Sequence, residues 1–182
     1  MGTTQDLQHV EAIKKIQELV EAANVCLFAT ELTRAPLSVR PMSTSKVDDE
    51  GAIWFFSKKD SEKNEHIQED DQVQLLYSNN GSSEYLSLYG YAEIVRDRNK
   101  IEELWTPIAK AWFKGGIEDP SITLIKVTPK EGHYWDTKNG KVISLIKIAA
   151  SVLTGKTSDD GVEGKVENMT SYSPDFVRSH KK

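Results

Sequence analysis

The stretch 40–68, RPMSTSKVDDEGAIWFFSKKDSEKNEHIQ, constrains the fold of this chain more than any other part of its sequence. Two runs of strand-forming residues, 37–47 and 52–57, flank the acidic turn 48–51, which ends in glycine. This pattern predicts a β-hairpin. Because Pro41 has no N–H to donate to a neighbouring strand, we expect part of the first strand to lie at a sheet edge or a bulge.

Basic and hydroxyl side chains gather where the second of these strands ends and a short helix is expected to begin. Ser61 is the predicted N-cap of that helix, which runs to about residue 68. The start of a helix presents free backbone N–H groups and the positive end of the helix dipole, a combination that suits a phosphate. The residues of this junction are Ser57, Lys58, Lys59, Ser61 and Lys63, with Arg40 one strand away.

The apolar run 53–56 adjoins this basic junction and offers a surface on which a flat ring can lie. A phosphate site beside a flat apolar surface predicts a nucleotide-like cofactor. The alternative interpretation is that the lysines form a solvated face and that the apolar run is an ordinary core strand.

Short turns separate the apolar runs along the rest of the chain. The predicted elements are helices at 7–24, 61–68 and 96–113, and strands at 25–30, 73–77, 85–95 and 122–128, the last closed by Pro129 and resumed at 133–135 after a turn at Gly132. We expect a bulge or a close approach at Gly90, and either a strand leading into a helix or a helix alone at 142–153. Regular βαβ alternation is absent, so the pattern favours a mainly β fold with helices: a small β-barrel with helices packed at its openings.

Composition bounds the class of protein. The chain has 182 residues, 38% of them hydrophobic and 28% charged, which is typical of one globular domain. We predict a domain at 1–153 and a loose polar tail at 154–182. A net charge of -5 argues against a general nucleic-acid binder. The lack of a long apolar run or an apolar leader predicts no membrane contact and a cytoplasmic location.

Motifs for metal sites and for nucleophilic hydrolysis are absent from the sequence. There is no CxxC, HExxH, GxSxG or phosphate-binding loop, so we expect no metal site and assign no catalytic residue. The single cysteine, Cys26, lies in an apolar run and is expected to be a buried, inert thiol. His66 is expected at the surface, and Asp136 is expected to be a turn carboxylate.

Several short motifs follow one another in a characteristic order. They are Arg40-Pro41-Met42-Ser43, then 53–57 followed by Ser61-Glu62-Lys63, then Gly90-Tyr91-Ala92-Glu93 leading to Asp97 and Trp105, then Trp112-Phe113 before 115–116 and Asp119-Pro120, and finally 127–129 before Tyr134-Trp135-Asp136. In this order the chain resembles, over residues 10–153, the general stress proteins of the pyridoxamine 5'-phosphate oxidase-like group. Members of that group are FMN-binding split β-barrels.

The resemblance implies FMN, or sometimes FAD, bound at the interface of a homodimer. Arg40 and Lys63 would pair with the phosphate, and Ser57 and Ser61 would donate hydroxyl hydrogen bonds to it. Trp135 would come from the second subunit and cover the flavin ring, although it is equally open to a place in the core of its own barrel. Phe56 would lie along the cofactor, and backbone groups beneath the isoalloxazine edge would come from Arg40, Pro41, Met42, Ser43, Thr44 and Ser45.

Two departures from the true oxidases bear on the substrate. Ser45 stands where the oxidases carry a substrate lysine, with Lys46 on the opposite strand face. Asp136 and the residues after it replace an Arg-x-His pair that binds the substrate in those enzymes. A phosphorylated vitamin should need such cations, so we expect that the flavin site is kept and the vitamin site is lost.

The expected function is therefore that of a flavoprotein that is not a true pyridoxamine-phosphate oxidase. A flavin-dependent oxidoreductase acting on a small molecule is one form of it, and a non-catalytic stress sensor is the other. Further alternatives are an interaction protein with an empty barrel, or a split barrel that binds a deazaflavin or a haem. Haem would need His66 or His133 as its axial ligand.

Overall fold

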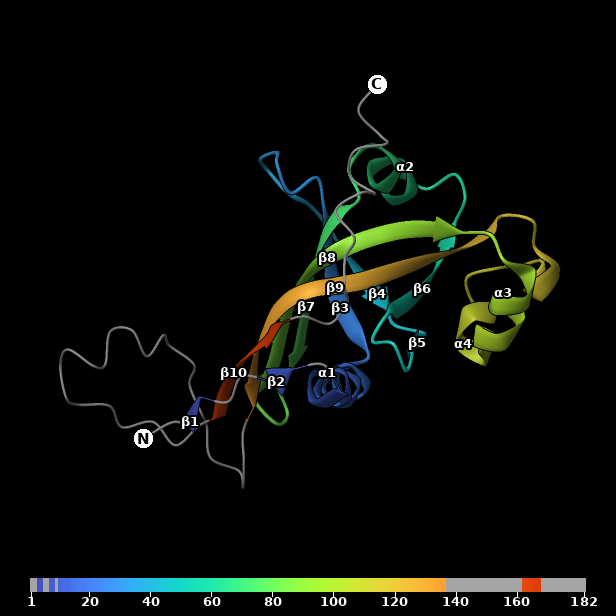
Figure 1. The fold of residues 1–182 in the computed structure, drawn as a ribbon. Helices are drawn as coiled ribbons and strands as arrows, with labels where there is room; N and C mark the ends of the chain where they lie inside the picture. Colours follow the sequence, from blue (N-terminus) through green and yellow to red (C-terminus); the bar gives the residue numbers. More distant parts are fainter. Residues whose placement is uncertain (1–2, 5–6, 9, 137–161, 168–182) are drawn as a thin grey trace.

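One curled sheet forms the body of the protein (Figure 1). The computed structural model describes residues 3–4, 7–8, 10–136 and 162–167. The strands are β1 (Thr3–Thr4), β2 (Leu7–Gln8), β3 (Val25–Thr30), β4 (Ser38–Ser43), β5 (Lys46–Val47), β6 (Ile53–Lys58), β7 (Gln72–Asn79), β8 (Glu84–Val95), β9 (Ile122–Asp136) and β10 (Val162–Glu167). The helices are α1 (Val10–Ala23), α2 (Glu62–Glu69), α3 (Arg98–Leu104) and α4 (Pro107–Lys110), and Gly116–Glu118 forms a 3-10 turn.

The longest strand, β9, connects the two parts of the sheet. Strands β4, β3, β7, β8 and β9 follow one another as antiparallel neighbours. The other edge of β9 is divided, because its first half pairs with β6 and its second half pairs with β10. Both β8 and β9 are strongly curved in Figure 1. The sheet is therefore a split β-barrel, and the predicted mainly β class with helices is confirmed.

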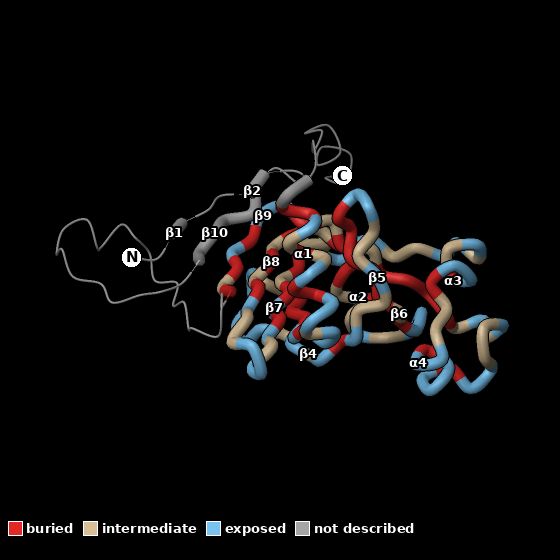
Figure 2. The backbone as a smooth tube through the Cα atoms, turned by 90° about the horizontal axis from the view of Figure 1, so that it is seen from below, coloured by how far each residue is buried: buried red, intermediate tan, exposed pale blue. Residues whose placement is uncertain are grey.

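Alternation along the strands divides the buried side chains into two clusters. Phe28 and Phe55 meet edge to face inside the barrel, with 5.3 Å between ring centroids, and α1 adds Ile16 to this core. Trp54 lies on the other face of β6, in a smaller cluster with residues of α3 such as Leu104. Figure 2 shows buried positions concentrated on the strands and on α1. Strand β6 thus has apolar contacts on both faces, as its run of apolar residues requires.

Cys26 belongs to the inner core. It is 1% exposed, and burial raises the pKa of its thiol to about 12. The prediction of a buried, inert thiol is confirmed.

The predicted helix at 96–113 is broken in two. Helix α3 ends at Leu104, and α4 begins at Pro107. Thr106, before the proline, is extended with φ −125° and ψ 158°, and its Oγ1 accepts from the N–H of Ala109 at 3.2 Å. Proline disfavours helical geometry in the residue before it and suits the first position of a helix. The prediction of one continuous helix is wrong for this local reason.

The predicted break in the 122–135 region is also wrong, because β9 is continuous from Ile122 to Asp136. Pro129 lies opposite Gly90, where the register between β8 and β9 shifts, so the missing N–H falls at the predicted bulge. Gly132 marks a close approach to β8, because a Cβ there would lie 2.8 Å from the carbonyl oxygen of Ser87.

The two ends of the described chain also depart from expectation. Helix α1 begins at Val10, and Leu7 instead pairs with Val166 of β10. The expectation of a loose tail fails for Val162–Glu167, which forms β10 antiparallel to β9. The segment 142–153 and the predicted domain boundary at 153 lie outside the described residues. Among the helices that the structure describes, none is long and apolar enough to cross a membrane.

Gly90→Ala tests the close approach of β8 and β9. A Cβ at this position would lie 2.3 Å from the carbonyl oxygen of Thr128. We expect the free energy of unfolding to fall by about 1–3 kcal/mol, measured by urea denaturation. In the matched control Gly81→Ala, the nearest atom to the added Cβ is the Asn79 side chain at 3.5 Å, so the change should stay within about 0.5 kcal/mol. Equal stability of Gly90→Ala and the parent would contradict the packing.

Candidate anion site at the start of α2

Strand pairing and helix α2 bring Arg40 and Lys63 to one end of the barrel. Arg40 lies on β4 opposite Phe28 of β3, and its guanidinium turns along the strand toward the end of β3. Its Nη1 donates to Thr30 Oγ1 at 2.8 Å, and its Nη2 donates to Ser38 Oγ. Lys63 lies in the first turn of α2, directly after the end of β6.

The charge of Arg40 affects the pKa of Lys63. Burial lowers the pKa of Lys63, and the charges of Arg40 and Lys58 lower it further. Burial also lowers the pKa of Arg40, while the carboxylates of Glu62 and Glu31 act in the opposite direction. Positive charges in a partly desolvated place favour an anion with more than one negative charge.

The first turn of α2 adds backbone donors to these cations. Ser61 is the N-cap, as predicted, with φ −93° and ψ 142°, and its carbonyl accepts from the N–H of Asn64 at 2.8 Å. Its side chain makes no capping hydrogen bond. Among the described residues, no acceptor faces the N–H groups of Glu62 and Lys63. The start of α2 therefore presents two backbone donors beside Lys63.

Ser57 lies beneath this turn in a buried polar network. Its hydroxyl is 3.1 Å from Ser61 Oγ and donates to Asn64 Oδ1 at 2.7 Å. Asn64 in turn donates to Thr123 Oγ1 at 3.0 Å. Because Ser57 and Asn64 are almost fully buried, this network fixes α2 to β6 and β9. Ser61 is half-buried and lies nearer the surface.

The segment 40–45 runs from Arg40 away from Thr30 and towards the start of β3, and two of its backbone donors are already engaged. The N–H of Thr44 donates to the Asn24 carbonyl at 2.9 Å, and the N–H of Ser45 donates to the Trp54 carbonyl at 2.8 Å. Met42 packs in the core, whereas Pro41 and Ser43 are exposed.

Phe56 lies on the opposite face of β6 from Ser57 and packs against aromatic side chains. Its ring packs edge to face on Trp105 at 5.6 Å and lies 6.0 Å from Phe113. Successive side chains of a strand point to opposite faces, so Phe56 faces α3 and α4 while Ser57 faces the network under α2.

Trp135 lies far from the cations of its own chain. It follows Thr123, the neighbour of Ser57, by twelve residues of β9, which is about 40 Å of strand path. It pairs with Tyr85 and is half-buried, whereas the adjacent Tyr134 is 2% exposed and fills the core. The alternative place for Trp135, in the core of its own barrel, is thus taken by Tyr134.

His66 is a residue that sequence reasoning missed. Its side chain is 14% exposed, its Nδ1 lies 3.0 Å from Thr30 Oγ1, and its Nε2 lies 3.4 Å from Glu31 Oε2. The expectation of a surface histidine is therefore wrong. The available signal was its spacing, since a residue three positions after Lys63 lies on the same helix face.

A separate cleft of about 380 Å³ lies beside α3 and includes neither Arg40 nor Lys63. It is bordered by Lys59, Arg96 and Arg98. Arg98 donates to the Ile117 carbonyl at 2.6 Å and pairs with glutamates, so its charge is already matched.

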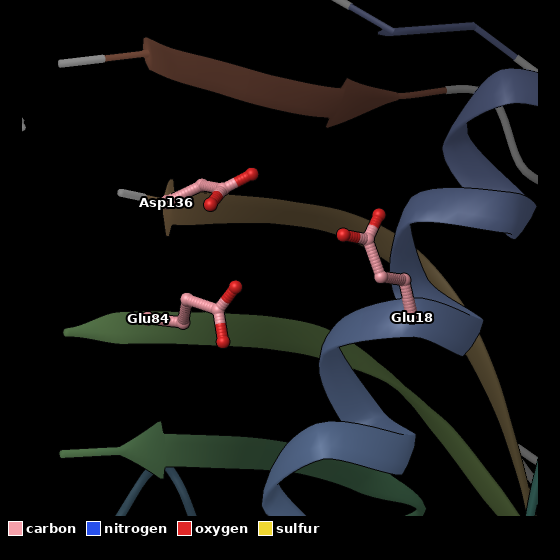
Figure 3. A group of neighbouring side chains, drawn as sticks. All are labelled: Glu18, Glu84 and Asp136. Atoms are coloured by element: carbon pink, nitrogen blue, oxygen red, sulfur yellow. The ribbon is translucent and has the colours of Figure 1, made fainter. Parts of the chain in front are cut away.

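An acidic group lies at the far end of β9, where Glu18, Glu84 and Asp136 approach one another (Figure 3). Lys15 pairs with Asp136 and lies 3.2 Å from Glu18. Burial lowers the pKa of Lys15, but its hydrogen bonds to Asp136 and Glu18 outweigh that effect and raise it. Asp136 is therefore a buried ion-pair partner that ties α1 to β9, and its expected place in a turn is wrong.

Comparison with known proteins identifies the fold and the family together. The family model described as "Pyridoxamine 5'-phosphate oxidase like" matches residues 11–159. The chain belongs to this family. The resemblance stated from the motifs is thus confirmed.

Individual relatives agree with this assignment. A candidate general stress protein 26 from Jannaschia sp. CCS1 is 30% identical with a TM-score of 0.65, over 86% of this chain and 97% of that structure. A protein related to general stress protein 26 from Clostridium acetobutylicum is 25% identical with a TM-score of 0.60. The match covers 76% of this chain and 95% of that structure. The general stress FMN/FAD binding protein of Xanthomonas citri shares the fold at 24% identity, with a TM-score of 0.61 over 74% and 97%.

A curated relative is Protein bli-3 of Neurospora crassa. It is 29% identical in an alignment of 112 positions, which covers 57% of this chain and 54% of that protein. The match thus spans about half the length of this relative.

Ser57→Ala tests whether the hydrogen bond from the Ser57 hydroxyl to Asn64 stabilises the packing of α2 on β6. The change removes the donor to Asn64 Oδ1 in a buried place, so we expect the free energy of unfolding to fall by about 1–3 kcal/mol in urea denaturation. Ser61→Ala is the matched control, because its half-buried hydroxyl makes no capping bond, and it should cost less. Equal losses in the two variants would contradict a special role for Ser57.

Proposed function

We propose that this chain binds FMN, with the phosphate held by Arg40, Lys63 and the first turn of α2. The observation that carries the proposal is the meeting of Arg40 and Lys63 at the start of α2, where burial and the charges of Arg40 and Lys58 lower the pKa of Lys63. The N–H groups of Glu62 and Lys63, which donate to no acceptor among the described residues, complete the donor set. This combination fits the terminal phosphate of FMN, which carries close to two negative charges at neutral pH.

Relatives support a flavin in preference to other nucleotides. The Xanthomonas citri structure is an FMN/FAD binding protein, and a Nostoc punctiforme structure with a TM-score of 0.51 is described as an FMN binding protein. FAD shares the phosphate next to the riboflavin unit, so it is the second candidate for the same site. Haem is disfavoured, because both ring nitrogens of His66 face oxygen atoms of Thr30 and Glu31 and His133 is exposed.

A bound flavin would supply redox chemistry by accepting and passing on a hydride or electrons. The part of this chain is then to hold the phosphate through Arg40 and Lys63 and to exclude water from the ring. We propose a small-molecule oxidoreductase that is not a pyridoxamine-phosphate oxidase, since Ser45 stands at the place of the substrate lysine. A flavin-binding stress protein without turnover is the alternative, and the cytoplasmic location stays a prediction.

A homodimer would complete the flavin site. Val25, Leu27, Val39 and Leu76 are 42–49% exposed and lie on the adjacent strands β4, β3 and β7. Leu27 pairs with both Pro41 and Leu76, so these apolar side chains form one continuous surface at the sheet edge. Such a surface supports a second copy of the chain as its cover. The remote place of Trp135 also fits the proposal that it covers the flavin held by the partner.

Arg40→Ala tests the phosphate site. Charge-assisted hydrogen bonds contribute about 1.5–3 kcal/mol each, so we expect FMN binding to weaken by roughly ten- to a hundredfold. Titration of the flavin-free protein, followed by flavin absorbance and fluorescence, measures it. Arg96→Ala removes an exposed arginine elsewhere and should leave the affinity unchanged. If Arg40→Ala binds FMN as tightly as the parent, the phosphate assignment is wrong.

Trp135→Ala tests the shared site. A half-buried residue outside the core should change the melting temperature of the flavin-free protein little. The loss of a stacked indole should weaken FMN binding, by about 0.5–1.5 kcal/mol beyond area burial, and brighten flavin fluorescence. Trp112→Ala, which removes a tryptophan that is 68% exposed, is the control and should change neither. Large destabilisation of the flavin-free protein with unchanged flavin fluorescence would exclude the shared site.

A further inference from the structure

A hydrogen-bonded chain of side chains runs behind the anion site and ends on the guanidinium of Arg40. Arg40 Nη1 lies 2.8 Å from Thr30 Oγ1, which lies 3.0 Å from Nδ1 of His66. Nε2 of His66 lies 3.4 Å from Glu31 Oε2. Thr30 is fully buried, and the side chain of His66 is 14% exposed, so water competes little with these contacts.

The distances favour one direction for these hydrogen bonds. A guanidinium only donates, so Thr30 Oγ1 accepts from Arg40 and keeps its own proton for another acceptor. The Ser38 carbonyl lies 3.5 Å from Thr30 Oγ1, whereas the His66 nitrogen lies at 3.0 Å and is the better acceptor. With its Nδ1 accepting, neutral His66 carries its proton on Nε2, which faces the Glu31 carboxylate.

Glu31 is held in place by an unusual backbone conformation. Its φ is +58°, in the left-handed region that residues other than glycine rarely occupy. The Arg34 N–H donates to the Glu31 carbonyl at 3.0 Å, and Arg34 Nη1 donates to Glu31 Oε1 at 2.8 Å. A conformation that costs free energy persists when its surroundings fix it, and here it aims a carboxylate at His66.

We propose that His66 is a positioning residue which, through Thr30, orients the guanidinium of Arg40 for the phosphate of the cofactor. This inference rests on the proposed function and deepens it. The charged groups around His66 are Glu31 after β3, Glu62 on its own helix at 3.9 Å, and Arg40 on β4 by way of Thr30. Since His66 acts on the phosphate ligand alone, its loss affects FMN and spares riboflavin, which has no phosphate.

Substitutions that mimic one ring nitrogen at a time separate the two contacts of His66. His66→Asn keeps a polar atom near the Nδ1 position and its contact with Thr30, whereas His66→Gln keeps one near the Nε2 position only. We expect His66→Gln and His66→Ala to raise the Kd for FMN about three- to tenfold, and His66→Asn to stay within about twofold of the parent. Riboflavin should bind all of these variants and the parent alike.

Two controls distinguish positioning from a general effect on folding. Gln68→Ala changes an exposed residue of the same helix and should alter neither Kd. In the Arg40→Ala background, His66→Ala should add nothing to the loss of FMN affinity, because the group that it positions is gone. Equal losses for FMN and riboflavin, or a His66→Ala effect that survives in that background, would overturn the inference and leave the proposed function intact. A parent protein that binds neither flavin would overturn both.

Discussion

The pairing of β8 with β9 is the contact on which the rest of the structure depends. These two strands pair from Tyr85–Trp135 to Val95–Leu124, and the opposite edge of β9 carries β6 and β10. Their close approach requires the absence of a side chain at Gly90 and Gly132. Because β9 sets the register of β6, it also sets where β6 ends and where α2 begins. The pairing register of β6 with β9 therefore determines where the candidate anion site lies.

The anion site itself is an arrangement of like charges that the fold holds together. Arg40 comes from β4 and Lys63 from α2, and repulsion by the charge of Arg40 lowers the pKa of the partly buried Lys63. The buried network of Ser57, Asn64 and Thr123 keeps the start of α2 from moving away from that repulsion. A bound phosphate would offset the repulsion between the cations, and this would favour phosphate binding. This is the pattern expected when a site is formed before its ligand arrives.

The geometry of β9 also supports the proposal that two chains share each flavin site. Its first half supports the anion site through β6, and Trp135 lies at its other end, about 40 Å away along the strand. In the proposed homodimer, a second copy covers the apolar surface around Leu27, at the β4 edge of the sheet, and supplies its own Trp135. Each chain would then hold one phosphate and cover one ring of its partner.

The sequence by itself determined the features that depend on near neighbours. Turn chemistry predicted the hairpin at 48–51, glycine predicted the bulge at Gly90, and the basic residues up to Lys63 predicted a place where cations lie close together. Each of these follows from a few adjacent residues. The break before Pro107 was equally local, and its signal was present in the sequence.

Tertiary structure decided the rest. Pro129 stays within the continuous strand β9 because the register shift at Gly90 of β8 lies opposite it. No N–H is needed from the proline at that point. Phe56 faces α3 because the barrel takes the other face of β6, with Ile53 and Phe55, as its interior. His66 is largely shielded from solvent because Glu31 and Thr30, more than thirty residues earlier, pack against it. Burial and hydrogen bonding need two parts of the chain in contact. The sequence of one segment does not show which other segment will pack against it.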